Sequence, residues 1–458
     1  MPTIYPFVPV QYAQAVSAKP GTPADLSALI APPYDVLDQA GKDGLLARSE
    51  DNIVAIDLPH LPAKDLGPDI EYASAGLRLR AKLQEGVFVK RAEPVMFVYR
   101  QTFEYAGGRH QRTGVVATLD IAPFGPGKDG RGGILPHEQT FSGPKQDRLA
   151  LMQATGMQIS PIFGLVPDEH HNLARRVAHI AGLRPAEVVG TTDDGCLHEL
   201  WAVHDEGTLA HLTHDLAGQD VLIADGHHRY TTAMTYLEHL QAGGKKLPAD
   251  HPARRCMFVL VSLHDSGLVI GPTHRVLAGI KGYSWHAFER ASKGHLHLAP
   301  VHGGLGSIEH AMKVGAKKGG KNVLGLYDFA TGTAHLCTPI DPDPLKGAFP
   351  DKPHAWRTLD VAICQHLIVE QIAQAKLNGG QPVQWAFPHS VADVDALGRG
   401  EGGKSGVGAD FEPQLGVIVD PTPLTAVREV CGANELMPQK STYFYPKLAT
   451  GLFMFGLS

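Results

Sequence analysis

The pattern of apolar and polar positions predicts strands and helices in turn along the chain. Apolar runs rich in β-branched and aromatic residues predict strands at 95–105, 113–122, 160–166, 221–224, 254–265, 323–329 and 415–420. Apolar residues three and four positions apart predict helices at 147–156, after Thr231 and at 359–372. The stretch between the first two strands contains glycine and suits a hairpin. Strands that alternate with helices in this way indicate a mixed α/β fold.

Three stretches are dense in glycine, and we expect loops or linkers there: 125–133, 303–320 and 398–408. No repeat at a fixed period is present. At roughly 100–200 residues per domain, a chain of 458 residues predicts two to three structural units. We expect an N-terminal region over 1–275 and a C-terminal α/β region over 276–458.

Composition narrows the class of protein. Hydrophobic residues make up 43% of the chain, which is enough for at least one large core. The net charge of −6 argues against a dedicated nucleic-acid binder, whose binding domain is usually basic, so no nucleic-acid partner is expected. The N-terminus lacks a signal-peptide pattern, and no apolar run approaches the ~18 residues of a membrane span. We therefore expect a cytoplasmic protein with no membrane partner; a homo-oligomer is left open.

The five cysteines are scattered without C-x-x-C spacing. Neither a zinc knuckle nor a disulfide framework is indicated, and buried thiols in a reducing compartment are expected. A literal phosphate-loop match, Gly398 followed by Gly403-Lys404-Ser405, lacks the strand before it and the helix after it that the motif needs. We interpret it as a chance match in a glycine loop.

The segment VLIADGHHRY (221–230) carries the strongest indication of chemistry. Asp225 and Gly226 leave a buried strand, and His227, His228 and Arg229 then occupy the first turn of a helix. Ligands of α/β proteins usually bind beyond the carboxyl end of a strand, and a helix N-terminus with an arginine favours phosphate. Asp225 could orient Mg²⁺ or accept a proton. The alternative is that Asp225 caps the helix and the histidines are buried and satisfied.

A second polar cluster lies in ILPHEQTFSGPKQDRLALM (134–152). Its candidate residues run from a loop into the start of a helix: His137, Glu138, Thr140, Lys145 and Arg148. The basic side chains near a helix start suit a phosphate, and a carboxylate beside a histidine can take a proton from a hydroxyl group. The alternative is a solvated helix start whose charges pair with one another.

A third cluster, MPQKSTYFYPKLATGLFMF (437–455), lies near the C-terminus. Lys440, Ser441 and Thr442 could hold an anion, and Tyr443 and Tyr445 could stack on a base. The alternative is a final strand and loop that pack on the core.

Seven ordered segments together resemble the bacterial and archaeal family known as domain of unknown function 1015. They are IAPPYDVLD (30–38), ILPHEQTF with DRLALM, SPIF, VLIADGHHRYTTA, GPTHRV (271–276), LDVAICQHLI (359–368) and MPQKSTYFYPK. The resemblance covers nearly the whole chain, and it implies no established reaction.

The strand–DGHHR–helix segment also resembles the ParB/sulfiredoxin-like fold, and in particular its free-serine kinases. That resemblance implies a ParB/sulfiredoxin-like core with an additional α/β subdomain. It implies that the turn Asp225–Arg229 holds nucleotide phosphates and that an upstream glutamate, for which Glu138 is the candidate, activates the substrate hydroxyl.

We therefore expect a nucleotide-dependent phosphotransferase, using ATP or ADP with Mg²⁺, that acts on the hydroxyl of a small metabolite such as serine or a hydroxy acid. Either Glu138 or a histidine, His227 or His228, would activate that hydroxyl. Positioning and charge neutralisation supply most of the catalysis in such reactions. A non-catalytic nucleotide-binding regulatory protein is the alternative, and a metal-dependent hydrolase is a third hypothesis.

Overall fold

A computed structural model describes residues 3–19, 21–63, 65–127, 132–138, 142–244, 246–401 and 410–458, with the side chains of Ser142 and Pro144 left out. The chain forms two compact units. The first unit comprises Met1–Pro136, Thr140–Val269 and Pro446–Ser458, and the second comprises His137–Gln139 and Ile270–Tyr445. The C-terminal segment therefore belongs to the first unit, whereas the sequence led us to expect a single division after residue 275.

The largest sheet lies in the first unit. Within the described residues its strand order is β3-β10-β11-β5-β6-β13-β9-β12-β7, and β1 pairs with β6. The strands are β1 (Ile4–Tyr5), β3 (Ala24–Asp25), β5 (Met96–Tyr105), β6 (Gly108–Asp120), β7 (Ile134–Leu135), β9 (Ile162–Val166), β10 (Val188–Thr191), β11 (Leu197–Val203), β12 (Val221–Asp225) and β13 (Arg255–Ser262). Pairing is mixed, because β9 runs parallel to β13 and antiparallel to β12. The mixed α/β fold expected from the sequence is confirmed.

The predicted hairpin is confirmed as the pair β5 and β6, but its turn is shorter than expected. Tyr105 pairs with Gly108, so that only Ala106 and Gly107 form the turn. Both have positive φ angles, 49° and 79°. Two-residue turns of this kind match the twist of the flanking strands. The residues after Gly107 therefore continue directly as a strand.

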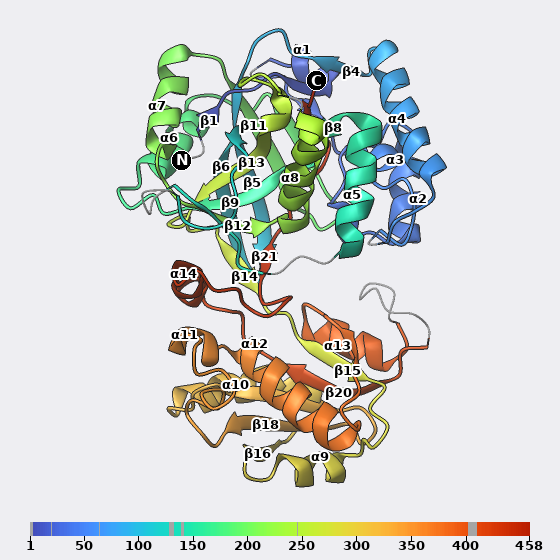
Figure 1. Cartoon of the computed structure of the whole chain (residues 1–458), viewed down its shortest axis with the longest axis vertical. Helices are drawn as coiled ribbons and strands as arrows, with labels where there is room; N and C mark the ends of the chain where they lie inside the picture. Colours follow the sequence, from blue (N-terminus) through green and yellow to red (C-terminus); the bar gives the residue numbers. More distant parts are fainter. Residues whose placement is uncertain are drawn as a thin grey trace. The chain divides into compact units, whose positions relative to one another are not determined.

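The first unit also contains a small sheet of order β4-β2-β22-β8 and several helices. The strands are β2 (Pro9–Tyr12), β4 (Phe88–Lys90), β8 (Met157–Gln158) and β22 (Met454–Gly456). The helices are α1 (Ala13–Ser17), α2 (Gln39–Arg48), α3 (Val54–Asp57), α4 (Asp69–Gln84), α5 (Ser142–Thr155), α6 (Asn172–Leu183), α7 (Glu206–Leu216) and α8 (His227–Gln241). Helices α4, α5 and α8 lie side by side, with α5 in the middle (Figure 1). Helix α8 follows β12 directly, so this group places the start of α8 near α5.

The second unit has a sheet of order β16-β18-β17-β20-β15-β19. The strands are β15 (Arg275–Ala278), β16 (Leu296–Val301), β17 (Leu324–Asp328), β18 (Thr333–Pro339), β19 (Gln384–Ala386) and β20 (Pro413–Ile418). The helical segments are α9 (Trp285–Ser292), α10 (Ile308–Lys317), α11 (His354–Arg357), α12 (Asp360–Ala362), the π-helical η5 (Ile363–Leu377), α13 (Val391–Gly398) and α14 (Leu424–Gly432). The predicted strands at 323–329 and 415–420 and the predicted helix at 359–372 are confirmed as β17, β20 and α12 with η5.

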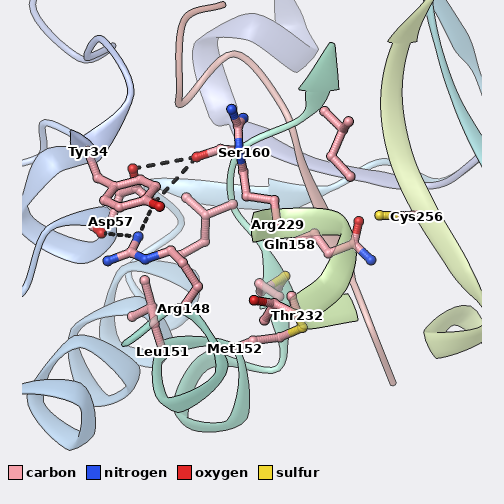
Figure 2. A pocket seen from close by; sticks show the side chains of 13 residues that line it. Tyr34, Asp57, Arg148, Leu151, Met152, Gln158, Ser160, Arg229, Thr232 and Cys256 are labelled. Atoms are coloured by element: carbon pink, nitrogen blue, oxygen red, sulfur yellow. Dashed lines mark hydrogen bonds and ion pairs between the residues drawn. The ribbon is translucent and has the colours of Figure 1, made fainter. Parts of the chain in front are cut away.

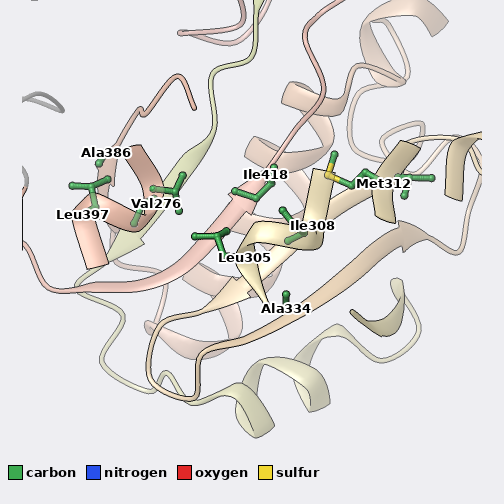
Figure 3. Close-up of a cluster of buried hydrophobic side chains, with 10 residues drawn as sticks. Val276, Leu305, Ile308, Met312, Ala334, Ala386, Leu397 and Ile418 are labelled. Carbon is green, nitrogen blue, oxygen red and sulfur yellow. The ribbon is translucent and has the colours of Figure 1, made fainter. Parts of the chain in front are cut away.

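The prediction of a loop over 303–320 is wrong, because helix α10 occupies most of it. Ile308 and Met312, one helical turn apart, are both buried and join the core of the second unit with Val276 and Ile418 (Figure 3). Burial of this apolar stripe outweighs the low helix propensity of the surrounding glycines. Across the described part of the chain, no helix is both long enough and apolar enough to cross a membrane.

Candidate functional site

The candidate site begins where β12 ends. Val221, Leu222, Ile223 and Ala224 are buried in the sheet, whereas Asp225 is only partly buried. The register between β12 and β9 shifts between Ile223 and Asp225. Such irregularities re-aim a side chain at the end of a strand. The sequence VLIAD thus delivers one carboxylate to the carboxyl end of a buried strand.

Gly226 makes the turn from β12 into α8 possible. Its φ angle is +97°, in the left-handed region that favours glycine. A Cβ at this position would lie 3.1 Å from Nε and 3.2 Å from Cζ of Arg229. Glycine therefore gives both the backbone conformation and the room in which Arg229 folds back toward Asp225.

Asp225 is paired with two cations. Its Oδ2 is paired with Arg229, whose other terminal nitrogen donates to the carbonyl of Pro161, and its Oδ1 lies 2.5 Å from Nζ of Lys447. The backbone around Lys447 is held by a 2.9 Å hydrogen bond from Gln101 on β5 to its carbonyl oxygen. Among these three side chains, one carboxylate lies between two cations, so that one positive charge is in excess.

These charges determine the protonation state of Asp225. Burial raises its pKa, but Lys447, Arg229 and His227 together lower it by more, so that the pKa lies well below its ordinary value. Asp225 is therefore ionised at neutral pH and is a weak proton acceptor. Its role in this arrangement is to hold Arg229 and Lys447 in place.

The two histidines of the DGHHR turn begin α8 as expected. His227 is buried and His228 is half-buried. The carbonyl of His227 accepts a 2.9 Å hydrogen bond from the hydroxyl of Thr231, within the first turns of the helix. The positive charge that His227 can carry adds to those around Asp225.

Helix α5 brings Lys145 and Arg148 to the neighbourhood of α8. The hydroxyl of Thr232 on α8 donates to the carbonyl of Lys145 at 3.5 Å. Arg148 is buried: its Nε lies 2.6 Å from Asp147, and its Nη1 donates to the carbonyl (2.7 Å) and the carboxylate (3.2 Å) of Asp57. Much of the hydrogen-bonding capacity of Arg148 is thus used by the chain itself.

A small cavity lies between these elements in the first unit (Figure 2). Its polar lining includes Asp57, Ser160, Arg148 and Arg229. The guanidinium of Arg148 stacks on the ring of Tyr34, 3.8 Å from its centre. The cavity volume is about 40 Å³, within an opening whose empty space, open solvent included, amounts to about 450 Å³. The cavity volume is room for about three water molecules.

His137 and Glu138 belong to the second unit, with Lys440, Ser441 and Thr442. The backbone N–H groups of these three residues donate to the Glu138 carboxylate at 3.1, 2.8 and 3.2 Å. The ring of His137 is hydrogen-bonded to the hydroxyl of Thr442 at 2.7 Å. The backbone of 440–442 therefore does bind an anion, and in this structure the anion is the chain's own carboxylate.

Side-chain hydrogen bonds to backbone carbonyls hold the turn that surrounds Glu138. Arg275 donates to the carbonyl of Lys440 at 3.0 Å, and Thr422 donates to the carbonyl of Ser441 at 2.6 Å. The hydroxyl of Ser441 donates to the carbonyl of Pro438 at 2.5 Å. Because these hydrogen bonds hold the carbonyl groups of the turn, its N–H groups face Glu138.

The predicted site residues are distributed over both units. Asp225–Arg229, Lys145 and Arg148 lie in the first unit, and His137, Glu138, Lys440, Ser441 and Thr442 lie in the second. Thr140 lies outside the described residues, as do Gly403, Lys404 and Ser405 of the phosphate-loop match, whose Gly398 ends helix α13.

Four residues of the site were not selected from the sequence: Tyr34, Asp57, Ser160 and Lys447. Three of them lie in segments that carry the family resemblance, since Tyr34 is in IAPPYDVLD, Ser160 begins SPIF and Lys447 ends MPQKSTYFYPK. Asp57 lies in none of these segments, and no pattern in the sequence singled it out.

Fold and site together define a mixed α/β protein with a positively charged strand–turn–helix site. The family model described as "Protein of unknown function (DUF1015)" matches residues 4–362. The chain belongs to this family, as its ordered segments led us to expect. A comparison with curated proteins finds no match.

Several solved structures are distantly similar to the chain. A free serine kinase mutant in complex with ADP is 13% identical with a TM-score of 0.33, covering 70% of this chain and 89% of the kinase. A conserved hypothetical protein from Pyrococcus furiosus is 16% identical with a TM-score of 0.30, covering 69% and 89%. SbnI from Staphylococcus aureus, truncated at its C-terminus, is 9% identical with a TM-score of 0.31, covering 69% and 82%. At these scores, function has to be argued from the chemistry of the site.

Proposed function

We propose that the chain is a nucleotide-dependent phosphotransferase that transfers a phosphoryl group to the hydroxyl of a small metabolite. The observation that supports this most directly is the arrangement of Arg229 and Lys447 around Asp225 at the start of α8. Two cations held by one ionised carboxylate form a preorganised, positively charged site where a strand meets a helix N-terminus. Nucleotide phosphates are the ligands that such sites take.

In this proposal Arg229 and Lys447 neutralise the charge of the phosphates, aided by the first turn of α8, and Asp225 keeps the two cations in place. Gly226 allows the close approach that the phosphates need. Phosphoryl transfer gains most of its catalysis from positioning and charge neutralisation, so these roles match the chemistry. Lys145, whose backbone lies against α8 near the start of α5, is a further candidate cation in this proposal.

The donor set does not suit a Mg²⁺ ion bound by the protein alone. Both oxygens of Asp225 already pair with cations. The described residues contain no group of three or more His, Cys, Asp or Glu side chains that could hold a metal. In the proposal, Mg²⁺ therefore arrives as part of the nucleotide substrate.

The acceptor class, serine or a small hydroxy acid, rests on the likeness of the DGHHR turn to that of free-serine kinases. Glu138, the candidate base under that likeness, has its carboxylate held by three backbone N–H groups of the second unit. A carboxylate bound in this way serves well as a structural anion.

Phosphorus NMR of the purified chain with ATP or ADP, Mg²⁺ and a panel of small hydroxyl-bearing metabolites tests the proposal. A new phosphoester signal that is lost in Arg229→Ala and strongly reduced in Asp225→Asn is expected. No phosphoester with any acceptor, or unchanged turnover in both variants, contradicts it. Tight nucleotide binding without any product supports the alternative of a regulatory nucleotide-binding protein.

A further inference from the structure

The small cavity of the first unit contains a carboxylate to which the proposed function gives no role. Asp57, the last residue of α3, is only 3% exposed and lines this cavity with Ser160 and Arg229 (Figure 2). The hydroxyl of Ser160 lies 3.4 and 3.5 Å from the two oxygens of Asp57, a loose contact that a better donor could replace.

Arg229 joins this cavity to the proposed phosphate site. One of its terminal nitrogens pairs with Asp225, while its side chain also lines the cavity beside Asp57. Because the two side chains lie close together, the charge of Arg229 lowers the pKa of Asp57, although burial raises it by more. A group bound in the cavity therefore lies next to the cation that would hold the transferring phosphoryl group.

The size and lining of the cavity limit what can enter it. The cavity volume of about 40 Å³ is far too small for a nucleotide, but it suits a hydroxymethyl group. The apolar walls are Leu151, Met152, Met157, Ile159 and Ile162. They favour a short aliphatic end over a polyol.

We infer that Asp57 takes the proton from the acceptor's hydroxyl group and that this cavity holds the short aliphatic alcohol end of the acceptor. The inference rests on the proposed phosphotransfer at Asp225, Arg229 and Lys447. The hydroxyl oxygen forms a bond to the terminal phosphorus of the nucleotide, and the bond from that phosphorus to the bridging oxygen breaks. The electron pair leaves with the shortened nucleotide, and the hydroxyl proton passes to Asp57 and then to solvent.

The environment of Asp57 supports this role. Burial raises the pKa of Asp57 above its ordinary value, although Arg148 and Arg229 oppose the shift. A base works best when its pKa approaches the working pH, so the direction of this shift favours proton transfer. Arg148 also keeps Asp57 oriented, while its own buried Nη2 has no hydrogen-bond partner in the described structure. A ligand oxygen within its reach would satisfy that donor.

The test compares Asp57→Asn with Asp147→Asn in the phosphotransfer assay. Asp147 pairs with the same arginine but does not line the cavity, so it is a matched control. For Asp57→Asn we expect a loss in kcat of about 10²–10⁴-fold with an unchanged KM for the nucleotide. For Asp147→Asn we expect kcat within about tenfold of the wild type. Turnover of Asp57→Asn within tenfold of the wild type overturns the inference.

The wild-type pH profile keeps the inference testable if Asp57→Asn does not fold. The value of kcat/KM for the acceptor should fall on the acid side as Asp57 becomes protonated, with a midpoint above about 3.9. A rate that does not change between about pH 4 and pH 7 overturns the role of Asp57. Absence of any phosphoester in the wild type, by contrast, contradicts the proposed function itself.

Discussion

Removal of the Asp225 carboxylate should destabilise the first unit more than removal of an exposed carboxylate with the same kind of partner. In Asp225→Asn, Arg229 and Lys447 both lose their ionic partner. The side chains of Asp225, Arg229 and Lys447 are 21%, 13% and 17% exposed. Loss of one partner of a fully buried pair costs about 3–5 kcal/mol, and loss of an exposed pair costs about 0–1 kcal/mol. For this partly buried group we expect about 2–4 kcal/mol.

The matched control is Asp193→Asn. Asp193 pairs with Arg48 at 2.5 Å in the same unit, but the two side chains are 59% and 45% exposed. Guanidinium unfolding should be followed by hydrogen exchange of peptides over 221–241, which report on the first unit alone. If the loss of stability in Asp225→Asn is within about 0.5 kcal/mol of the loss in Asp193→Asn, burial adds nothing to the Asp225 ion pairs and the expectation is wrong.

The difference in stability between Asp225→Asn and the wild type should also depend on pH in a specific way. Because the folded-state pKa of Asp225 is lowered, its contribution to stability is fully present above the unfolded pKa of about 3.9 and is lost as pH falls toward the folded value. The deficit of Asp225→Asn should therefore be constant from about pH 5 to pH 8 and should shrink below about pH 4. A deficit that changes across the neutral range contradicts the assignment of a lowered pKa.

Other substitutions test separate parts of the structure. Gly226→Ala should cost about 1–3 kcal/mol, because alanine is strained at φ +97° and its Cβ would press on Arg229; a stability equal to wild type in chemical unfolding contradicts the turn geometry. Met312→Ala should destabilise the second unit by about 2–5 kcal/mol, since Met312 is 1% exposed in the core; a thermal scan with no shift argues against that packing. Burial raises the pKa of Asp360 to about 6, so the ionised side chain destabilises the fold as pH rises from about 4 to about 6. Asp360→Asn should therefore be more stable than wild type above pH 6 by up to about 3 kcal/mol, and the gain should vanish near pH 4; a gain that is equal at both pH values contradicts this.

Local patterns predicted the part of the site that is local in sequence. The buried run VLIA followed by Asp225–Gly226 and an amphipathic stretch predicted β12 and α8, and the structure confirms both. Apolar periodicity and a glycine at a positive-φ turn are both signals that extend over only a few residues. A single segment of the sequence is therefore enough to predict a strand, a turn and the start of a helix. Helix α10 was not predicted, because the glycines of the 303–320 stretch, most of which lie outside the helix, outweighed the apolar pair Ile308 and Met312.

Partners distant in sequence could not be predicted in this way. Lys447 reaches Asp225 across 222 positions, and Ser441 donates to Glu138 across 303 positions. The residues next to these pairs in the sequence do not indicate that they meet. Which residues meet is decided by the order of strands in a sheet and by the return of the C-terminal segment to the first unit. Asp57 entered the site in the same manner, since its neighbours in the cavity come from α5, α8 and the segment before β9.

In the proposed function, Arg229 and Lys447, held by Asp225, form the phosphate site. Calorimetric titration of ADP with Mg²⁺ into the wild type and into Lys447→Met measures how much Lys447 contributes to nucleotide binding. We expect saturable binding by the wild type that weakens at least about tenfold in Lys447→Met and weakens further with added salt. No binding by the wild type, or equal affinity in the two proteins, would contradict the proposed phosphate site.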